Sequence, residues 1–140
     1  MTNRIKVLGI NIDPLTMRET VDTVEQYVLG KRALHLMGVN ADKINQCHTD
    51  EKIKKIVNDS GIINADGASV VLASKFLGTP VPERVAGIDL MQSLLELSNN
   101  KGYSVYFFGA KEEVLQDMLK AFKNDYPNLI VVGHRNGYFS

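Results

Sequence analysis

The chain has 140 residues, of which 44% are hydrophobic and 23% charged, as in an ordinary globular domain. Sixteen basic and sixteen acidic side chains cancel, which argues against nucleic acid as a partner and against a polybasic membrane-binding surface. No apolar run approaches the roughly 20 residues that span a bilayer, and no signal peptide is recognisable. We therefore expect one cytoplasmic domain over residues 1–140, in which the single cysteine, Cys47, stays reduced.

The N-terminal part begins with an alternating pattern. Residues 4–12 alternate apolar and polar side chains, which predicts a strand or a hairpin arm. Thr16 and Glu19 have the spacing of a capping box, at the start of a helix that Gly30 ends. An apolar strand over residues 33–39 follows.

Helices and strands then alternate along the chain. The predicted helices cover residues 41–46, 50–58, 69–77, 88–99 and 111–126, and the predicted strands cover residues 61–65, 104–108 and 129–132. A loop over residues 79–87 contains two prolines, which exclude a regular helix or ladder there. This order predicts an α/β fold: a mostly parallel, Rossmann-like sheet flanked by helices, with an N-terminal strand or hairpin.

Several polar or turn residues follow the predicted strands. Asn40, Asp66 and Gly109 each come directly after one strand, and His134 and Arg135 come after the last. Ligands of open parallel sheets bind beyond the carboxyl ends of the strands. We therefore expect the functional site at this edge.

Asp66 is the candidate acid or base of the site. An Asp-Gly pair after a strand often makes a turn or caps the next helix, and this is the first interpretation of Asp66 and Gly67. The second is a general base that takes a proton from a sugar hydroxyl, an effect of roughly 10²–10⁴-fold on rate. The spacing alone leaves both open.

Arg84 is the candidate cation. As a loop residue it would form a surface ion pair with Glu83 or Asp89, worth about 0–1 kcal/mol. Alternatively, its guanidinium would bind phosphate oxygens and stabilise the charge on a departing diphosphate.

Gly109 precedes a predicted helix that starts near Lys111. A glycine there lets a ligand approach the backbone, and a helix N-terminus attracts phosphate. The other interpretation is a tight turn between strand and helix. The three histidines have no metal-ligand spacing and no Asp-x-Asp motif is present, so no metal site is expected.

The segment 64–90 carries a resemblance to a known family. Its Asp66-Gly67 pair, followed by Glu-Arg-Val-Ala-Gly-Ile-Asp-Leu at residues 83–90, resembles the WecG/TagA/CpsF family of bacterial glycosyltransferases. Shorter matching segments extend the resemblance over nearly the whole chain, at residues 39–41, 105–110 and 133–139.

The resemblance implies a reaction and roles for particular residues. The enzyme would transfer N-acetylmannosamine or a related sugar, with inversion, from a UDP donor to N-acetylglucosamine on a polyprenyl diphosphate, without a cofactor. The product would enter teichoic acid or surface polysaccharide. Asp66 would be the base, and Arg84 would steady the diphosphate. The residues implied to bind substrate are Asn40, Gly67, Gly109 and Tyr138.

The sequence departs from the family pattern in two places. Family members often carry threonine where this chain has Gly38, so a hydroxyl contact is lost. The chain also ends at Ser140, before the C-terminal segment that would close the site and touch the inner face of the cell membrane. We therefore expect an N-terminal portion, able to form a homo-oligomer through exposed apolar surface. The alternative function is a module that binds a nucleotide or a partner without turnover.

Overall fold

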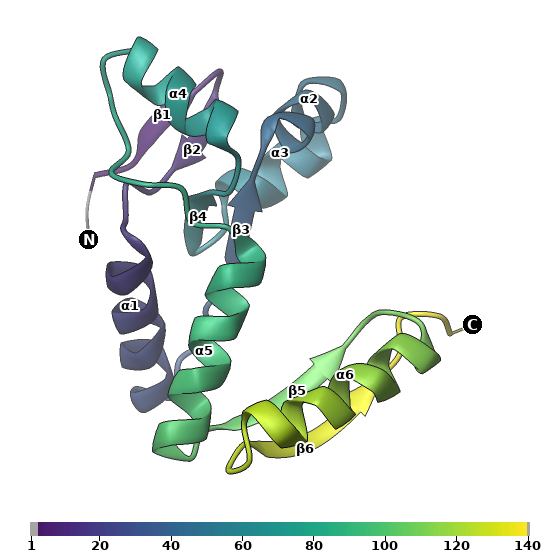
Figure 1. Ribbon diagram of the computed structural model, residues 1–140. Coiled ribbons are helices and arrows are strands. Elements are labelled where there is room, and N and C mark those ends of the chain that lie inside the picture. The colour runs from purple at the N-terminus through teal and green to yellow at the C-terminus, as the bar shows by residue number, and fades with distance from the viewer. Residues whose placement is uncertain (1–2, 140) are drawn as a thin grey trace. The chain divides into compact units, whose positions relative to one another are not determined.

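The computed structural model describes residues 3–139 (Figure 1). Its contacts divide the chain into two compact units, Met1–Leu90 and Met91–Ser140, within what the sequence predicts as one domain. Each unit is described by itself below.

The first unit begins with a hairpin. Strands β1 (Ile5–Val7) and β2 (Ile10–Ile12) pair antiparallel, with Val7 opposite Ile10. The two turn residues, Leu8 and Gly9, both have positive φ angles, 49° and 81°. Such a turn matches the right-handed twist of the strands it joins. Of the two forms predicted for residues 4–12, the structure has the hairpin.

Helix α1 (Met17–Leu29) has the predicted capping box. The Thr16 side chain accepts the backbone N–H of Glu19, and the Glu19 side chain accepts the backbone N–H of Thr16. Gly30 is the C-cap, as predicted. Both helix ends are set by residues near in sequence, which is why the pattern predicts them well.

A buried polar contact ties α1 to the centre of the unit. Asn64 Nδ2 donates to Thr20 Oγ1 over 3.1 Å, and that hydroxyl donates to the Thr16 carbonyl oxygen over 2.8 Å. Because Thr20 and Asn64 are both buried, each needs such a partner.

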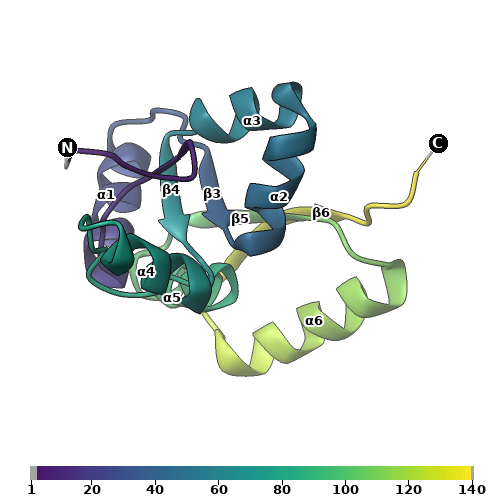
Figure 2. The same cartoon turned by 90° about the horizontal axis from the view of Figure 1, so that it is seen from above.

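Strands β3 (Leu36–Val39) and β4 (Ile62–Ala65) form a parallel pair in which Val39 lies opposite Ala65. Helices α2 (Ala41–Thr49) and α3 (Glu51–Asn58) connect them and lie beside the pair (Figure 2). Strand β3 is shorter than the predicted 33–39, because its partner strand begins only at Ile62, opposite Leu36.

Helix α4 (Ala68–Phe76) follows β4, and an irregular loop leads to helix α5 (Gly87–Lys101). The core of the first unit gathers apolar side chains from the hairpin, both strands and helices α2, α3 and α4. Its buried members are Val7, Ile10, Ile12, Val39, Ile44, Cys47, Val57, Ile63, Ala65, Val70 and Val81.

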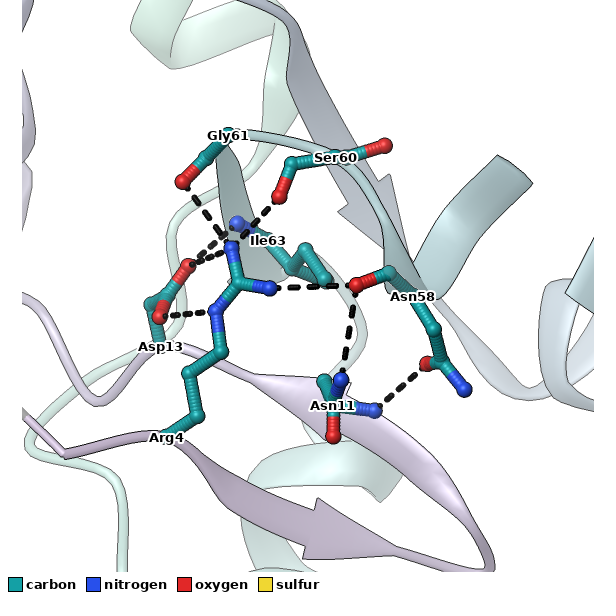
Figure 3. Close-up of polar contacts among 7 residues, drawn as sticks. All are labelled: Arg4, Asn11, Asp13, Asn58, Ser60, Gly61 and Ile63. Carbon is teal, nitrogen blue, oxygen red and sulfur yellow. Dashed lines mark hydrogen bonds and ion pairs between the residues drawn. The ribbon is translucent and has the colours of Figure 1, made fainter. Parts of the chain in front are cut away.

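An ion pair fixes the hairpin against β4 (Figure 3). Arg4 Nε lies 3.0 Å from Asp13 Oδ1, and Asp13 Oδ2 accepts the backbone N–H of Ile63 over 2.7 Å. The Arg4 guanidinium also donates to backbone carbonyl oxygens at the end of α3 and in the turn after it, those of Asn58, Ser60 and Gly61. One arginine thus joins the end of the hairpin to residues 58–61, which lie more than 50 positions away in sequence.

The second unit contains most of α5 and a strand–helix–strand motif. Strands β5 (Ser104–Phe108) and β6 (Ile130–Arg135) are parallel, and helix α6 (Glu112–Asp125) connects them. Its core contains Leu95, Phe107 and Leu115.

The predicted end of the last strand is wrong. Residues 129–132 were expected to form it, with His134 and Arg135 beyond its end, but β6 runs to Arg135. His134 pairs with Phe107 and Arg135 with Phe108. His134 and Arg135 belong to the strand because their backbones still pair with β5. The pattern of apolar residues in the sequence does not indicate this pairing.

The fold class is α/β, as predicted, with short parallel pairs compatible with a Rossmann-like arrangement. The described residues form three two-stranded sheets, β1–β2, β3–β4 and β5–β6. Within residues 3–139, no helix combines the length and apolar content needed to cross a membrane.

Candidate functional site

The carboxyl ends of β3 and β4 bring two predicted site residues to one edge. Because the strands are parallel with Val39 opposite Ala65, Asn40 and Asp66 leave the pair at the same end. The Asp66 backbone N–H donates to the Val39 carbonyl oxygen over 2.9 Å, which continues the ladder by one residue. The predicted convergence is confirmed for these two strand ends.

Asp66 does not cap the helix that follows it. The N-cap of α4 is Gly67, and that cap has no side-chain hydrogen bond. The side chain of Asp66 is 31% exposed, so its carboxylate is partly open to solvent. The helix-capping interpretation of Asp66 is therefore wrong, and the carboxylate is not used by the helix.

Arg84 lies against Asp66. Its Nε donates a hydrogen bond to the Asp66 carbonyl oxygen, and its Nη2 lies 3.9 Å from Asp66 Oδ1. Glu83, one of the acids proposed to pair with Arg84, instead accepts the backbone N–H of Met17 over 2.7 Å. The structure thus places the candidate base and the candidate cation in direct contact.

The loop that carries Arg84 is irregular, as its prolines predict, but it is held at several points. The Val85 backbone N–H donates to the Ala65 carbonyl oxygen over 2.9 Å, directly beside Asp66. The Val81 backbone N–H donates to Ser74 Oγ over 3.1 Å. Val81, Val85 and Ala86 are buried. These contacts hold the Arg84 backbone close to the end of β4.

Asn40 and Gly67 lie in contact at the same edge. Asn40 Oδ1 accepts the backbone N–H of Lys43 over 2.9 Å, so it caps α2. A Cβ atom built on Gly67 would lie 3.3 Å from Asn40 Cβ. Gly67 therefore allows the starts of α2 and α4 to approach closely, and a substrate-binding role for either residue stays a prediction.

Gly109 and Tyr138 belong to the second unit. The Gly109 backbone N–H donates to the Arg135 carbonyl oxygen over 2.9 Å, and φ at Gly109 is +132°, a conformation that favours glycine. The Tyr138 backbone N–H donates to Asn136 Oδ1 over 2.9 Å, and its side chain is exposed. Gly109 is thus used by a turn between strand and helix, and its contact with a donor stays a prediction.

A shallow cavity of about 350 Å³ lies at the start of α6. Its lining includes Lys111, Glu112, Glu113, Asn136 and Tyr138. Hydrogen bonds from Asn136 and Gln116 lower the pKa of Glu112 below its ordinary value. The two glutamates in the first turn count against the prediction that this helix start attracts phosphate.

Sequence reasoning missed what Gly38 does at the site. A Cβ atom built on Gly38 would lie 2.9 Å from Asp66 Oδ2, closer than real Cβ contacts. A glycine inside a strand pattern signals a close approach of another group, and this signal was present.

Within residues 3–139, no group of three or more His, Cys, Asp or Glu side chains is placed to hold a metal ion.

Comparison with known proteins gives one consistent result. The sequence profile of the glycosyl transferase WecG/TagA/CpsF family matches residues 5–140. Curated relatives from Staphylococcus aureus strains NCTC 8325, COL and N315 are named N-acetylglucosaminyldiphosphoundecaprenol N-acetyl-beta-D-mannosaminyltransferase. Each is 30% identical over 139 residues, 98% of this chain and 54% of the relative. The chain spans about half the length of these relatives.

Proposed function

Because the chain belongs to the WecG/TagA/CpsF family of glycosyl transferases, we propose that it carries the general base of an inverting sugar transfer. The donor is UDP-N-acetylmannosamine or a related UDP-sugar, and the acceptor is N-acetylglucosamine on a polyprenyl diphosphate. The product enters teichoic acid or surface polysaccharide. The observation that carries this proposal is the pairing of Asp66 with Arg84 at the carboxyl edge of β3 and β4.

The chemistry is a single displacement. The Asp66 carboxylate accepts the proton of the acceptor hydroxyl as the hydroxyl oxygen attacks the anomeric carbon of the donor. The bond from that carbon to the diphosphate oxygen breaks, and UDP leaves with the electron pair. The Arg84 guanidinium stabilises the negative charge on the leaving diphosphate.

The weakness of the ion pair supports these roles. Arg84 is 55% exposed, Asp66 is 31% exposed, and their closest charged atoms are 3.9 Å apart. An exposed pair of this kind contributes only about 0–1 kcal/mol. Substrate groups can therefore replace the pair at little cost, while the bond from Arg84 Nε to the Asp66 carbonyl oxygen keeps the guanidinium nearby.

The acceptor determines where the reaction takes place. A polyprenyl diphosphate is held in a membrane, so we place the chain in the cytoplasm at the inner membrane face, with peripheral contact through a further C-terminal segment. Self-association is part of the proposal. Leu72, Phe76 and Leu77 at the outer face and end of α4 are exposed, and a second copy would cover them.

A second candidate function is binding of UDP or a partner subunit without turnover. The chain spans 54% of the length of its relatives, and this function holds if transfer needs residues that lie outside the shared part. Binding of UDP to the folded state would then raise the melting temperature by mass action. A melting-temperature shift without turnover would favour this candidate.

A transfer assay on three proteins tests the catalytic proposal. The substrates are UDP-N-acetylmannosamine and a soluble polyprenyl-diphosphate N-acetylglucosamine analogue. Asp66→Asn keeps the shape of the side chain and removes its basicity, so we expect turnover to fall by roughly 10²–10⁴-fold. Asp59→Asn is the matched control, because Asp59 forms an exposed ion pair with Lys55 on α3.

The outcomes separate the candidates. Turnover in the wild type and the Asp59 variant, with loss in Asp66→Asn, supports Asp66 as the base. Near-normal turnover in Asp66→Asn would show that the base is another residue. Inactivity of all three proteins, with a UDP-dependent rise in melting temperature, would support the binding module.

A further inference from the structure

We propose that Glu83 is a positioning residue for Arg84. Its carboxylate ties the loop that carries Arg84 to the start of α1, and this tie holds the guanidinium beside Asp66. The role rests on the proposed function, in which Arg84 stabilises the leaving diphosphate, and Glu83 acts only through Arg84.

The Glu83 carboxylate satisfies a backbone group at the start of α1. Met17 is the first residue of that helix, and the backbone N–H groups of a first helical turn have no acceptor within the helix. Glu83 Oε1 accepts the Met17 N–H over 2.7 Å, although the two residues are 66 positions apart. The positive end of the helix dipole also favours a carboxylate there. Glu83 thus caps α1 from another part of the chain.

The start of α1 is fixed relative to the site. Just before the helix, the Asp13 backbone N–H donates to the Ile63 carbonyl oxygen over 2.7 Å. One turn into the helix, Thr20 Oγ1 accepts Asn64 Nδ2 over 3.1 Å. Ile63 and Asn64 both belong to β4, the strand that leads into Asp66. A group bound to the start of α1 is therefore also held relative to Asp66.

Arg84 lies between two attachments of the loop. On one side Glu83 is bound to α1, and on the other the Val85 backbone N–H donates to the Ala65 carbonyl oxygen over 2.9 Å. Pro82, Glu83 and Arg84 are exposed, so packing does little to fix them. Without the Glu83 contact, the backbone before Arg84 can turn about the Val85 attachment, which moves the guanidinium out of place.

Glu19 provides a matched control at the same helix end. Glu19 Oε2 accepts the Thr16 backbone N–H over 3.3 Å. Both glutamates therefore accept a backbone N–H at the start of α1, but Glu19 belongs to the helix itself and Glu83 belongs to the loop. Alanine at either position removes the same kind of bond from the same helix end, and only Glu83→Ala also releases the loop.

The first experiment measures hydrogen exchange of the Arg84 Nε–H group by NMR and needs no turnover. In the wild type this group donates to the Asp66 carbonyl oxygen, which slows its exchange with water. We expect Glu83→Ala to speed the exchange by at least about tenfold. Glu19→Ala should keep the wild-type rate, and so should Glu83→Gln, which retains an acceptor oxygen for Met17. The signal is identified by its absence in Arg84→Lys.

Two results of this experiment would overturn the proposal. Unchanged exchange in Glu83→Ala would mean that the contact does not hold Arg84. Equal acceleration in Glu83→Ala and Glu19→Ala would mean that weakening of α1 alone is responsible. If Glu83→Ala does not fold, Glu83→Asp decides, because its carboxylate is one methylene shorter. Faster exchange in Glu83→Asp supports the proposal, and the wild-type rate contradicts it.

The second experiment is the transfer assay on the same variants. A group misplaced by about 1 Å costs on the order of 10²-fold in rate. We expect Glu83→Ala to lower kcat by roughly 10–100-fold with little change in KM, because Arg84 acts on charge that forms as the diphosphate leaves. In the Arg84→Ala background, Glu83→Ala should lower kcat no further. Glu19→Ala should stay within about threefold of wild type.

The two backgrounds separate this role from the proposed function. An equal loss of kcat from Glu83→Ala in the wild-type and Arg84→Ala backgrounds would overturn the positioning role while the proposed function stands. Normal kcat in Glu83→Ala would overturn it as well. Inactivity of the wild type would count against the proposed function, and the exchange measurement would still decide whether Glu83 positions Arg84.

Discussion

Asp13 shows how a single residue can hold a fold in a way that its local sequence does not suggest. It follows β2 directly and its side chain is only 4% exposed. Its Oδ1 accepts from Arg4 Nε, and its Oδ2 accepts both the backbone N–H of Ile63 and Arg4 Nη2. A buried carboxylate with both oxygens satisfied is costly to disturb, because any group that replaces it must satisfy the same donors.

Asp13→Asn should therefore destabilise the protein. The amide can still accept the Ile63 N–H, but its Nδ2 group then faces the Arg4 guanidinium, donor against donor. We expect a loss of about 1.5–3 kcal/mol in the free energy of unfolding, measured by urea titration. Asp22→Asn is the control. Asp22 forms an exposed ion pair with Arg18 in which the charged atoms are 4.0 Å apart, so its substitution should lower the free energy of unfolding by less than about 0.5 kcal/mol. Equal losses in the two variants would contradict the structural role of Asp13.

The distance between partners in sequence explains which residue contacts could be predicted. The capping box of Thr16 and Glu19 spans three positions, and the pattern predicted it. Asp66 and Arg84 were predicted to lie at one edge of the sheet, but 18 positions separate them, and their direct contact was not predicted. Nothing near Asp13 in the sequence points to Ile63, which is 50 positions away.

Most helix and strand ends were predicted to within two residues, and the largest differences are at the start of β3, the end of β6 and the end of α2. Helix α5 was expected over residues 88–99 and covers Gly87–Lys101, and α6 was expected over residues 111–126 and covers Glu112–Asp125. Helix ends depend on local caps and on glycine or proline nearby. Strand ends depend on the partner strand, which a local pattern does not contain. This is why β3 is shorter and β6 longer than predicted.

The start of α6 and the end of β6 are joined by a contact that should depend on pH. Asn136 Nδ2 donates to Glu112 Oε2 over 2.7 Å, and this bond is the largest cause of the lowered pKa of Glu112. A lowered pKa in the folded state means that the contribution is complete above the ordinary glutamate pKa of about 4.3. It is lost as the pH falls through the lowered value.

The NMR signals of the Asn136 side-chain amide report this contact. We expect them to shift as the pH is lowered from the ordinary glutamate pKa through the lowered one. In Glu112→Gln, which keeps an acceptor oxygen without a titrating group, the signals should stay constant over the same range. Identical titrations in the two proteins would show that another group is responsible.

At the scale of the whole molecule, the two units have cores of different size. Among residues 3–139, eleven buried residues form the main core of the first unit and three form that of the second. A larger buried apolar surface gives a larger free energy of opening. The sequence predicted one mostly parallel sheet, whereas the described residues form three two-stranded sheets. The alternation of strands and helices indicates the fold class, but it does not indicate which strands pair.

Amide hydrogen exchange should reveal this difference. We expect the amides of β4 to exchange at least about tenfold more slowly than those of β5, since the second unit opens with a smaller loss of buried surface. Exchange measured by NMR at one pH compares both strands in a single sample. Equal protection in β4 and β5 would mean that the two units open together.

The bond from the Val85 N–H to the Ala65 carbonyl oxygen also makes residues 67–83 an excursion that returns to its starting point. Asp66 directly precedes this segment and Arg84 directly follows it. Gly78, near its middle, is exposed. An excursion anchored in this way can gain or lose residues at its far end without shifting its anchors. Insertions or deletions in the loop after α4 can therefore change its length and its contacts while Asp66 and Arg84 remain neighbours.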